Sequence, residues 1–150
     1  MKNRIALRPA TSEDEKFVDD LVFTTMRRYV EATWPNDSAA QHHYYEINKF
    51  DPSKTRILQV DGKDVGQLST TAREDCLFIN ELHIVPEYQR LGIGKQAIEQ
   101  IFKEAREKNL PVKATVLKVN QPSLRLCLDM GFEVVAEMDC RFHIQHVLRR

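Results

Sequence analysis

The chain has 150 residues, of which 42% are hydrophobic and 29% charged, which fits one globular domain over residues 1–150 and excludes a disordered or fibrous chain. Its 22 basic and 22 acidic side chains cancel, so we expect neither nucleic acid nor an anionic membrane as partner. Three cysteines without metal-ligand spacing predict free thiols in a reducing, cytoplasmic setting and no metal site. No apolar run approaches the roughly 18 residues of a membrane span or suits a secretory signal.

The first half of the chain predicts a strand, two helices and a hairpin. A capping box formed by Ser12 and Glu15 follows the first strand and starts a helix that continues toward Tyr29. After a weaker helix, the turn signal Asp61-Gly62 joins two β-rich segments. In order, we expect a strand at 5–7, helices at 12–29 and 39–50, and strands at 55–60 and 65–70.

The second half carries the strongest patterns. Residues 77–85 are largely apolar on both faces, which predicts a central strand. Strict alternation would place Phe78, Asn80, Leu82 and Ile84 on one face and Leu77, Ile79, Glu81, His83 and Val85 on the other. A long helix at 91–109, a strand at 112–119, a short helix closed by Gly131, and strands at 133–138 and 142–148 complete the chain. The expected fold is α/β, with a mixed sheet of about six to seven strands flanked by about four helices.

The segment between the central strand and the long helix predicts an anion site. Glycines stand here where the first main-chain amides of a helix have no carbonyl partner and the helix dipole is positive. Arg90 and Lys95 add positive charge, so a pyrophosphate is the expected guest. The alternative is that Gly92 and Gly94 only make a tight turn between strand and helix.

Two other phosphate motifs fit this segment less well. The pattern G-x-G-x-x-A begins at Gly92, but residues 86–91 separate it from its strand, and the next strand ends at Asn120 without the acidic residue of a dinucleotide site. A mononucleotide P-loop needs Ser or Thr after Lys95, where the chain has Gln96. A nicotinamide- or flavin-dependent enzyme is therefore a third functional alternative, which these two motifs do not favour.

Two signatures together resemble one family. Residues 89–94, Gln-Arg-Leu-Gly-Ile-Gly, resemble the Q/R-x-x-G-x-G/A motif of the GCN5-related N-acetyltransferases (GNAT). Downstream, a strand that ends in Asn120, a helix and then Gly131-Phe132 resemble the second signature of that family. The resemblance covers nearly the whole chain, and it implies a GNAT-like fold and transfer of the acetyl group of acetyl-CoA to an amine, without a metal.

The resemblance also implies which residues bind the coenzyme. The amides of one continuous run hold the pyrophosphate: Gln89, Arg90, Leu91, Gly92, Ile93, Gly94 and Lys95. Main-chain groups near Leu82, Ile84 and Val85 pair with the pantetheine arm, and Asn120 and Ser123 meet that arm from the next strand and helix. The two strands part, and the thioester lies in the gap. Asn120 also suits a helix N-cap. Aspartate in place of Gly92 or Gly94 should weaken cofactor binding and leave the stability of the free protein nearly unchanged.

Attack by an amine requires a base, because an amine is mostly protonated at neutral pH. Glu81 is our first candidate and His83, on the same strand face, is the second; a water, or two partly solvated side chains without a catalytic role, are the alternatives. Cys127 stands where the family often has a tyrosine that protonates the departing sulfur. It suits that role or a structural one, packed against Phe132 at the end of its helix.

Acceptor binding is expected from the segment before the first hairpin. Tyr29, Glu31, Trp34 and His43 provide aromatic rings and one carboxylate that could frame a cationic amine, although packing explains each residue as well. The acceptor, a small molecule or a peptide, and the oligomeric state, monomer or homodimer, stay open. A regulator that binds acyl-CoA without catalysis is the second function.

Overall fold

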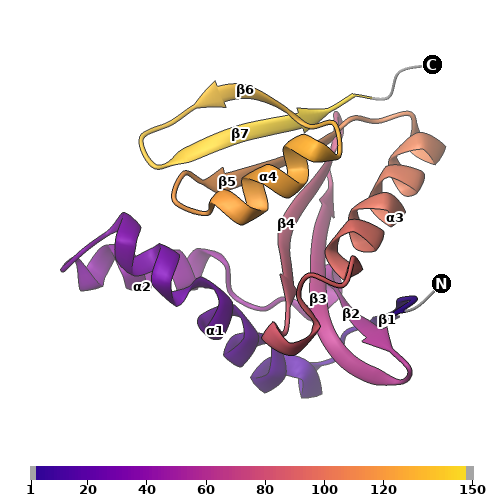
Figure 1. Cartoon of the computed structure of the whole chain (residues 1–150), viewed down its shortest axis with the longest axis horizontal. Coiled ribbons are helices and arrows are strands. Elements are labelled where there is room, and N and C mark those ends of the chain that lie inside the picture. Colours follow the sequence, from indigo (N-terminus) through magenta and orange to yellow (C-terminus); the bar gives the residue numbers. More distant parts are fainter. Residues whose placement is uncertain (1–2, 148–150) are drawn as a thin grey trace.

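A computed structural model describes residues 3–147 and has seven strands in one mixed sheet with four α-helices around it (Figure 1). The strand order is β1-β2-β3-β4-β5-β7-β6. The strands are β1 (Ala6–Pro9), β2 (Thr55–Val60), β3 (Lys63–Ala72), β4 (Leu77–Ile84), β5 (Val112–Leu117), β6 (Glu133–Glu137) and β7 (Arg141–His146). The helices are α1 (Glu15–Thr33), α2 (Ser38–Ile47), α3 (Ile93–Lys108) and α4 (Gln121–Asp129). The expected fold class is confirmed; of the strand predicted at 142–148, residue 148 lies outside the described residues.

The observed capping box lies one residue before the predicted one and caps the 3-10 turn Ser12–Asp14 that leads into α1. The reciprocal cap joins Thr11 and Asp14, with Asp14 Oδ2 accepting from the Thr11 amide at 2.9 Å and Thr11 Oγ1 accepting from the Glu13 amide at 3.3 Å. Arg8 decides between the two registers, because its guanidinium binds both oxygens of Asp14 at 2.8 and 3.0 Å. The pairing with Ser12 and Glu15 was therefore wrong by one position.

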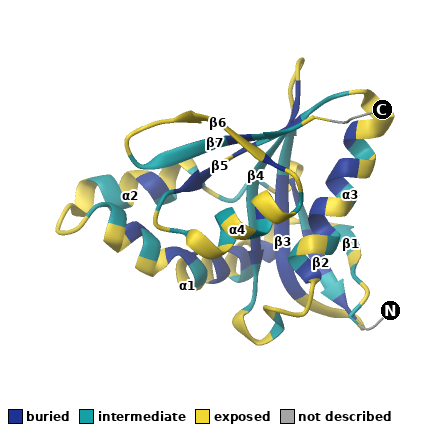
Figure 2. Ribbon diagram, turned by 45° about the horizontal axis from the view of Figure 1, so that its top comes forward, coloured by how far each residue is buried: buried dark blue, intermediate teal, exposed yellow. Residues whose placement is uncertain are grey.

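Two separate hydrophobic cores lie on the two faces of the sheet. The buried face of α3 packs with Cys127 of α4 and with one face of the sheet, whereas α1 and Tyr44 of α2 pack with Ile57 and Leu117 on the other face. Figure 2 shows the buried stripes of α1 and α3 turned toward the strands. We call these the α3 face and the α1 face. The apolar strand residues in these two cores therefore show which side chains of the sheet point to each face.

A β-bulge in β4 corrects the predicted alternation. Ser69 of β3 pairs with Glu81, but the next residue, Thr70, pairs with Ile79, so Asn80 is one extra residue on β4. The Asn80 amide is held by the hydroxyl of Thr71 at 2.9 Å. Before the bulge Leu77 and Ile79 pack on the α3 face, and after it Leu82 and Ile84 do so. Strict alternation was wrong here, because the extra residue reverses the faces in mid-strand.

The parallel pair β4 and β5 is joined only at its beginning. Two residue pairs, Leu77 with Val112 and Phe78 with Lys113, are in register, and β4 then leaves β5. β5 continues in register with β7 as far as Leu117 and Arg141. In Figure 1, β5 and β7 consequently run at a wide angle to β3 and β4. The opening between β4 and β5 is the feature on which the site is built.

Candidate active site

A groove with a volume of about 580 Å³ occupies the opening between β4 and β5. Its lining comes from both faces of the sheet. The α3 face contributes the segment before α3 and the start of α4, and the α1 face contributes side chains of α1, α2 and β7. The groove therefore passes through the sheet, and a molecule bound on one face can meet a molecule bound on the other.

On the α3 face, the start of α3 presents main-chain donors. Gly92 is the N-cap with φ of +81°, and no side chain in the described part of the chain caps the helix. The first intrahelical bond runs from the Gln96 amide to the Gly92 carbonyl at 3.1 Å, so the amides of Ile93, Gly94 and Lys95 have no carbonyl partner within the helix. These amides and two cationic side chains, Arg90 and Lys95, line the groove, and such an arrangement is chemically suited to bind an anion.

The predicted cofactor-binding residues do not all reach the groove. Leu91 is 45% exposed and lies outside the lining, and so does Val85, whose amide donates to the Val65 carbonyl at 2.8 Å. Since strand residues alternate, Leu82 and Ile84 turn their main-chain groups away from β3, toward the opening. The Ile84 carbonyl accepts from the Gln89 side chain at 3.0 Å.

The other predicted cofactor residues line the groove. These are Leu82, Ile84, Gln89, Arg90, Gly92, Ile93, Gly94, Lys95, Asn120 and Ser123. Asn120 is also the N-cap of α4, because its Oδ1 accepts from the Ser123 amide at 3.3 Å. Its capping role is thus confirmed.

The two glycines of the motif are not equivalent. Gly92 adopts the left-handed conformation, so any other residue there is strained whatever the space around it. A Cβ atom on Gly94 would meet only the Leu126 side chain, at 3.5 Å, an ordinary contact. The expectation that aspartate at either position leaves the free protein nearly unaffected is therefore wrong for Gly92, and only Gly94 provides a clean substitution.

On the α1 face, Glu81 and His83 form a buried pair beside the groove. Glu81 Oε2 lies 3.1 Å from His83 Nε2, and the two side chains are 10% and 8% exposed. Nε2 of Gln67, opposite His83 on β3, lies 3.1 Å from His83 Nδ1. Because this amide nitrogen can only donate, Nδ1 accepts and Nε2 carries the ring hydrogen. The imidazole then donates to Glu81, and Gln67 fixes that tautomer.

Burial shifts both pKa values toward the neutral forms. It raises the pKa of Glu81 and lowers the pKa of His83, because a charged group loses its hydration in the interior. The Glu81 Oε1 atom is buried and has no hydrogen-bond partner among the described residues. Burial first, and then the charge of Glu81, raises the pKa of the Tyr44 hydroxyl, which lines the same part of the groove. Glu81 thus has one oxygen fixed by His83 and one able to take a proton.

Cys127 closes α4 as the sequence indicated. Its carbonyl accepts from the Phe132 amide at 3.0 Å and the Leu128 carbonyl accepts from Gly131 at 3.1 Å, the two bonds of a Schellman ending, with Gly131 at φ of +99°. The thiol lies in the core of the α3 face and also lines the groove. Burial raises the pKa of Cys127 to about 11.

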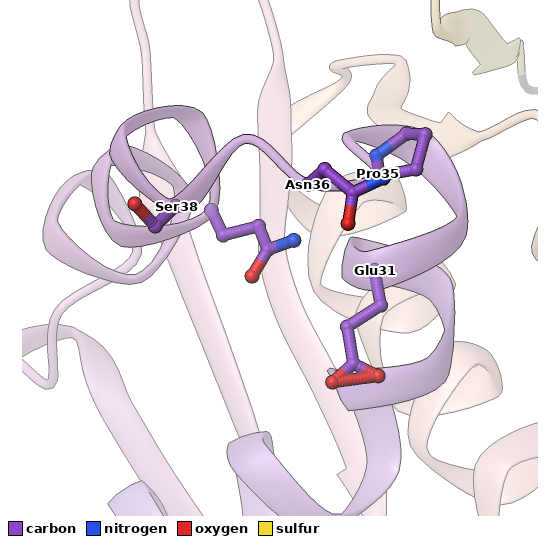
Figure 3. A pocket seen from close by; sticks show the side chains of 5 residues that line it. Glu31, Pro35, Asn36 and Ser38 are labelled. Carbon is purple, nitrogen blue, oxygen red and sulfur yellow. The ribbon is translucent and has the colours of Figure 1, made fainter.

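Among the predicted acceptor residues, Tyr29 lines the groove and three others do not. Glu31 faces a separate pocket of about 470 Å³ beside Pro35, Asn36 and Ser38, between the end of α1 and the start of α2 (Figure 3). Trp34 packs against Tyr44 with ring centroids 5.9 Å apart, and His43 is exposed on α2.

Sequence reasoning missed Gln67, Thr25 and Arg141 at this site. Arg141 follows a turn between two strands, and nothing in its neighbourhood in the sequence indicates a binding role. Within residues 3–147, no three His, Cys, Asp or Glu side chains form a cluster that could hold a metal, and no helix is long and apolar enough to cross a membrane.

A model of the acetyltransferase (GNAT) family matches residues 22–132, which is more than half of the chain. The chain belongs to the GNAT family. The part of the chain that matches the GNAT model includes the bulged strand β4, the main-chain amides at the start of α3 and the Schellman ending of α4. It ends before β6 and β7, so Arg141 lies outside it.

Solved structures share this GNAT fold. The PaiA N-acetyltransferase of Thermoplasma acidophilum, in complex with coenzyme A, matches 97% of this chain and 99% of its own with a TM-score of 0.78 and 16% identity. The structure of Ard1 from Thermoplasma volcanium matches 97% of this chain and 99% of its own, with a TM-score of 0.69 and 16% sequence identity. A third match is N-acetylglutamate synthase of Neisseria gonorrhoeae, complexed with coenzyme A and N-acetyl-glutamate. It covers all of this chain and 36% of its own, with a TM-score of 0.67 and 19% sequence identity.

Proposed function

We propose that this protein is an acetyl-CoA-dependent N-acetyltransferase in which an amine attacks the thioester directly, with donor and acceptor bound together. One observation carries the proposal. A single groove joins the main-chain amides at the start of α3, which have no carbonyl partner within the helix, to the buried Glu81–His83 pair on the other face of the sheet. The gap between β4 and β5 is where the acetyl carbon and the amine would meet.

The donor is held mainly by the main chain. The diphosphate of the coenzyme binds the amides before and within the first turn of α3, with Arg90 and Lys95 beside it. The pantetheine amides pair with the turned-out main-chain groups of Leu82 and Ile84, as an added strand would. Two of the structural neighbours are described as complexes with coenzyme A, which supports this assignment.

Glu81 acts as the base in this proposal. The amine nitrogen forms a bond to the thioester carbon, its proton passes to Glu81, directly or through a water, and the C–S bond then breaks to release the coenzyme as a thiolate. A raised pKa suits a base that works near neutral pH better than an ordinary glutamate does. His83, donating to the second oxygen, is a positioning residue.

Cys127 is a poor proton donor for the departing sulfur. Its pKa of about 11 lies above that of an ordinary thiol, about 8.5, so proton transfer from Cys127 to the coenzyme thiolate would be uphill by roughly 3 kcal/mol. The Schellman bonds and the core contacts explain this residue without catalysis. We therefore propose a structural role for Cys127 and protonation of the thiolate by solvent.

We also propose that residues 1–150 form a single domain and that the protein works in the cytoplasm. Both cores share one sheet, which supports a single domain over the chain. The three cysteines are free, which supports a reducing compartment such as the cytoplasm.

The test is release of free thiol from acetyl-CoA in the presence of a panel of amines, measured together with thermal unfolding. We expect acetyl-CoA to raise the melting temperature and NAD or FAD to leave it unchanged, with thiol release that depends on an amine. Stabilisation by acetyl-CoA without thiol release from any amine would favour the regulatory function. Stabilisation by NAD or FAD alone would overturn both.

A further inference from the structure

The acceptor end of the groove is richer in positive than in negative charge. On the α1 face, two guanidinium groups line it, Arg28 from α1 and Arg141 from β7. Within residues 3–147, one carboxylate lines this end, that of Glu81, and it is buried and bonded to His83. Glu31, expected to attract a cationic amine, faces the separate pocket instead.

Arg141 is held on the α1 face by its position in the sheet. It pairs in register with Leu117, which belongs to the core under α1, and neighbours across an antiparallel pair point to the same face. Its guanidinium lies 6.0 Å from the centre of the Trp34 ring, and its charge acts on the Tyr44 hydroxyl, whose pKa it lowers against the larger effect of burial.

Arg141 differs from the other partly buried cations, because it has no carboxylate partner within residues 3–147. Lys118, which follows Leu117 at the end of β5, binds Glu137 at 2.6 Å, Arg8 binds Asp14 at 2.8 Å and Arg56 binds Glu104 at 2.8 Å. No Asp or Glu in the described part of the chain lies within 4.0 Å of the Arg141 guanidinium. A half-buried guanidinium leaves up to five donors to satisfy, in a fork that matches a carboxylate.

Arg28 stands at the rim of the same end. It stacks over the Tyr29 ring at 4.8 Å and donates to the Tyr29 hydroxyl at 2.8 Å, which fixes its direction. Arg28 is exposed, so solvent and salt screen its charge. Its charge therefore attracts an approaching anionic ligand more than it stabilises the bound ligand. The half-buried Arg141 is the group that would hold a ligand.

We propose that the acceptor is a small amine that also bears a carboxylate, that is, an amino acid, with its carboxylate on the Arg141 fork and its amine at Glu81. This inference rests on the proposed function and narrows it. A bidentate pair with Arg141 fixes one end of the molecule, and Glu81 takes the proton at the other end. Polyamines and lysine-rich peptides would be repelled by the two guanidinium groups.

The experiment compares amino acids with their own carboxamides, for example glycine with glycinamide and β-alanine with β-alaninamide. The amine of the carboxamide is less basic, so a larger fraction of it is neutral and able to attack the thioester at neutral pH. Amine basicity alone therefore favours the carboxamide, and a preference for the amino acid would have to come from binding of its carboxylate. We expect the wild type to prefer the acid in kcat/KM by at least about tenfold, since a hydrogen bond to a charged group contributes about 1.5–3 kcal/mol. Arg141→Gln should bring the ratio of acid to carboxamide to about one or below it.

Two further variants complete the design. Arg141→Lys keeps the charge but not the fork, so it should keep only part of the preference for the acid. Arg106→Gln, on an exposed face of α3 outside the groove, is the matched control and should keep the wild-type ratio. A wild-type ratio near one, or a ratio that Arg141→Gln does not change, overturns the inference while leaving the acetyltransferase proposal intact.

A binding measurement separates this inference from the proposed function. Calorimetry with the coenzyme A complex should show binding of the amino acid and of its N-acetyl product, weakened about 10- to 100-fold by Arg141→Gln. Binding that depends on Arg141 without any thiol release would refute the catalytic proposal and keep the carboxylate site. Absence of binding by any carboxylate, with carboxamides turned over, would refute the carboxylate site alone.

Discussion

The two ends of the groove are built in different ways. The part of the donor end proposed to hold the diphosphate, at the start of α3, comes from one segment within residues 89–95 and presents mainly backbone amides. The acceptor end combines side chains from α1, α2, β4 and β7, which come from distant parts of the sequence. A main-chain site tolerates side-chain changes and keeps one ligand, whereas a site made of side chains from four elements can change its ligand by single substitutions.

The largest expected effect is at the acceptor end, where Glu81→Gln removes the base. We expect kcat/KM to fall by about 10² to 10⁴-fold, the usual contribution of general base catalysis. In the wild type the rate should rise with pH through the pKa of Glu81, which burial raises above its ordinary value, and the variant should lack that limb. A pH profile of Glu81→Gln that keeps the limb would remove Glu81 as the base.

Stability provides the control for this variant. A carboxyl group whose pKa is raised in the folded state stabilises the protein most below the pKa of an ordinary glutamate, and that contribution is lost as the pH rises through the raised value. Glutamine does not titrate. At neutral pH, Glu81→Gln should therefore melt no lower than the wild type. Any excess of its melting temperature over that of the wild type should shrink as the pH is lowered.

The next effect is at the donor end. Gly94→Asp places a carboxylate beside the diphosphate, and we expect affinity for coenzyme A to fall at least about tenfold, or about 1.4 kcal/mol, by calorimetry. Gly94→Ala adds only a Cβ atom at ordinary contact with Leu126 and is the matched control. Equal affinities of the two variants would contradict binding of the diphosphate by the main-chain amides at the start of α3.

Gln67→Leu tests the link from β3 to the base. Without the donor to His83 Nδ1, the imidazole is no longer fixed as a donor to Glu81, so the pKa of Glu81 should rise further. A rise of one unit in the pKa of Glu81 moves the rising limb of the pH profile to higher pH. At pH values below that pKa, the rate should then fall about tenfold. Loss of stability without a shift of the limb would show that Gln67 is only structural. Gln145→Leu on β7 is the control.

The smallest expected effect is that of Cys127→Ala. If the thiol only packs at the end of α4, kcat should change by less than about threefold, with a loss of stability of about 1 kcal/mol for the removed sulfur. A fall in kcat of about 10²-fold with KM unchanged would instead identify Cys127 as the proton donor.

Local chemistry was enough for the donor end and for most elements. The apolar stripe of α3, the Asp61-Gly62 turn with both φ values positive, and the Schellman ending at Gly131 each depend on residues within one or two turns. The motif at 89–94 depends only on glycines next to a helix start. These features appear in the sequence because the atoms that interact are neighbours along the chain.

Only the tertiary structure decided the acceptor end. The extra residue Asn80 is visible only against β3, and it turns Glu81 and His83 to the α1 face. The contact between Gln67 and His83, the placement of Arg141 beside Trp34, and the removal of Glu31 to another pocket depend on the pairing of distant strands and on how α1 crosses the sheet. Register between distant strands comes from the packing of the whole molecule, and a sequence read locally does not contain it.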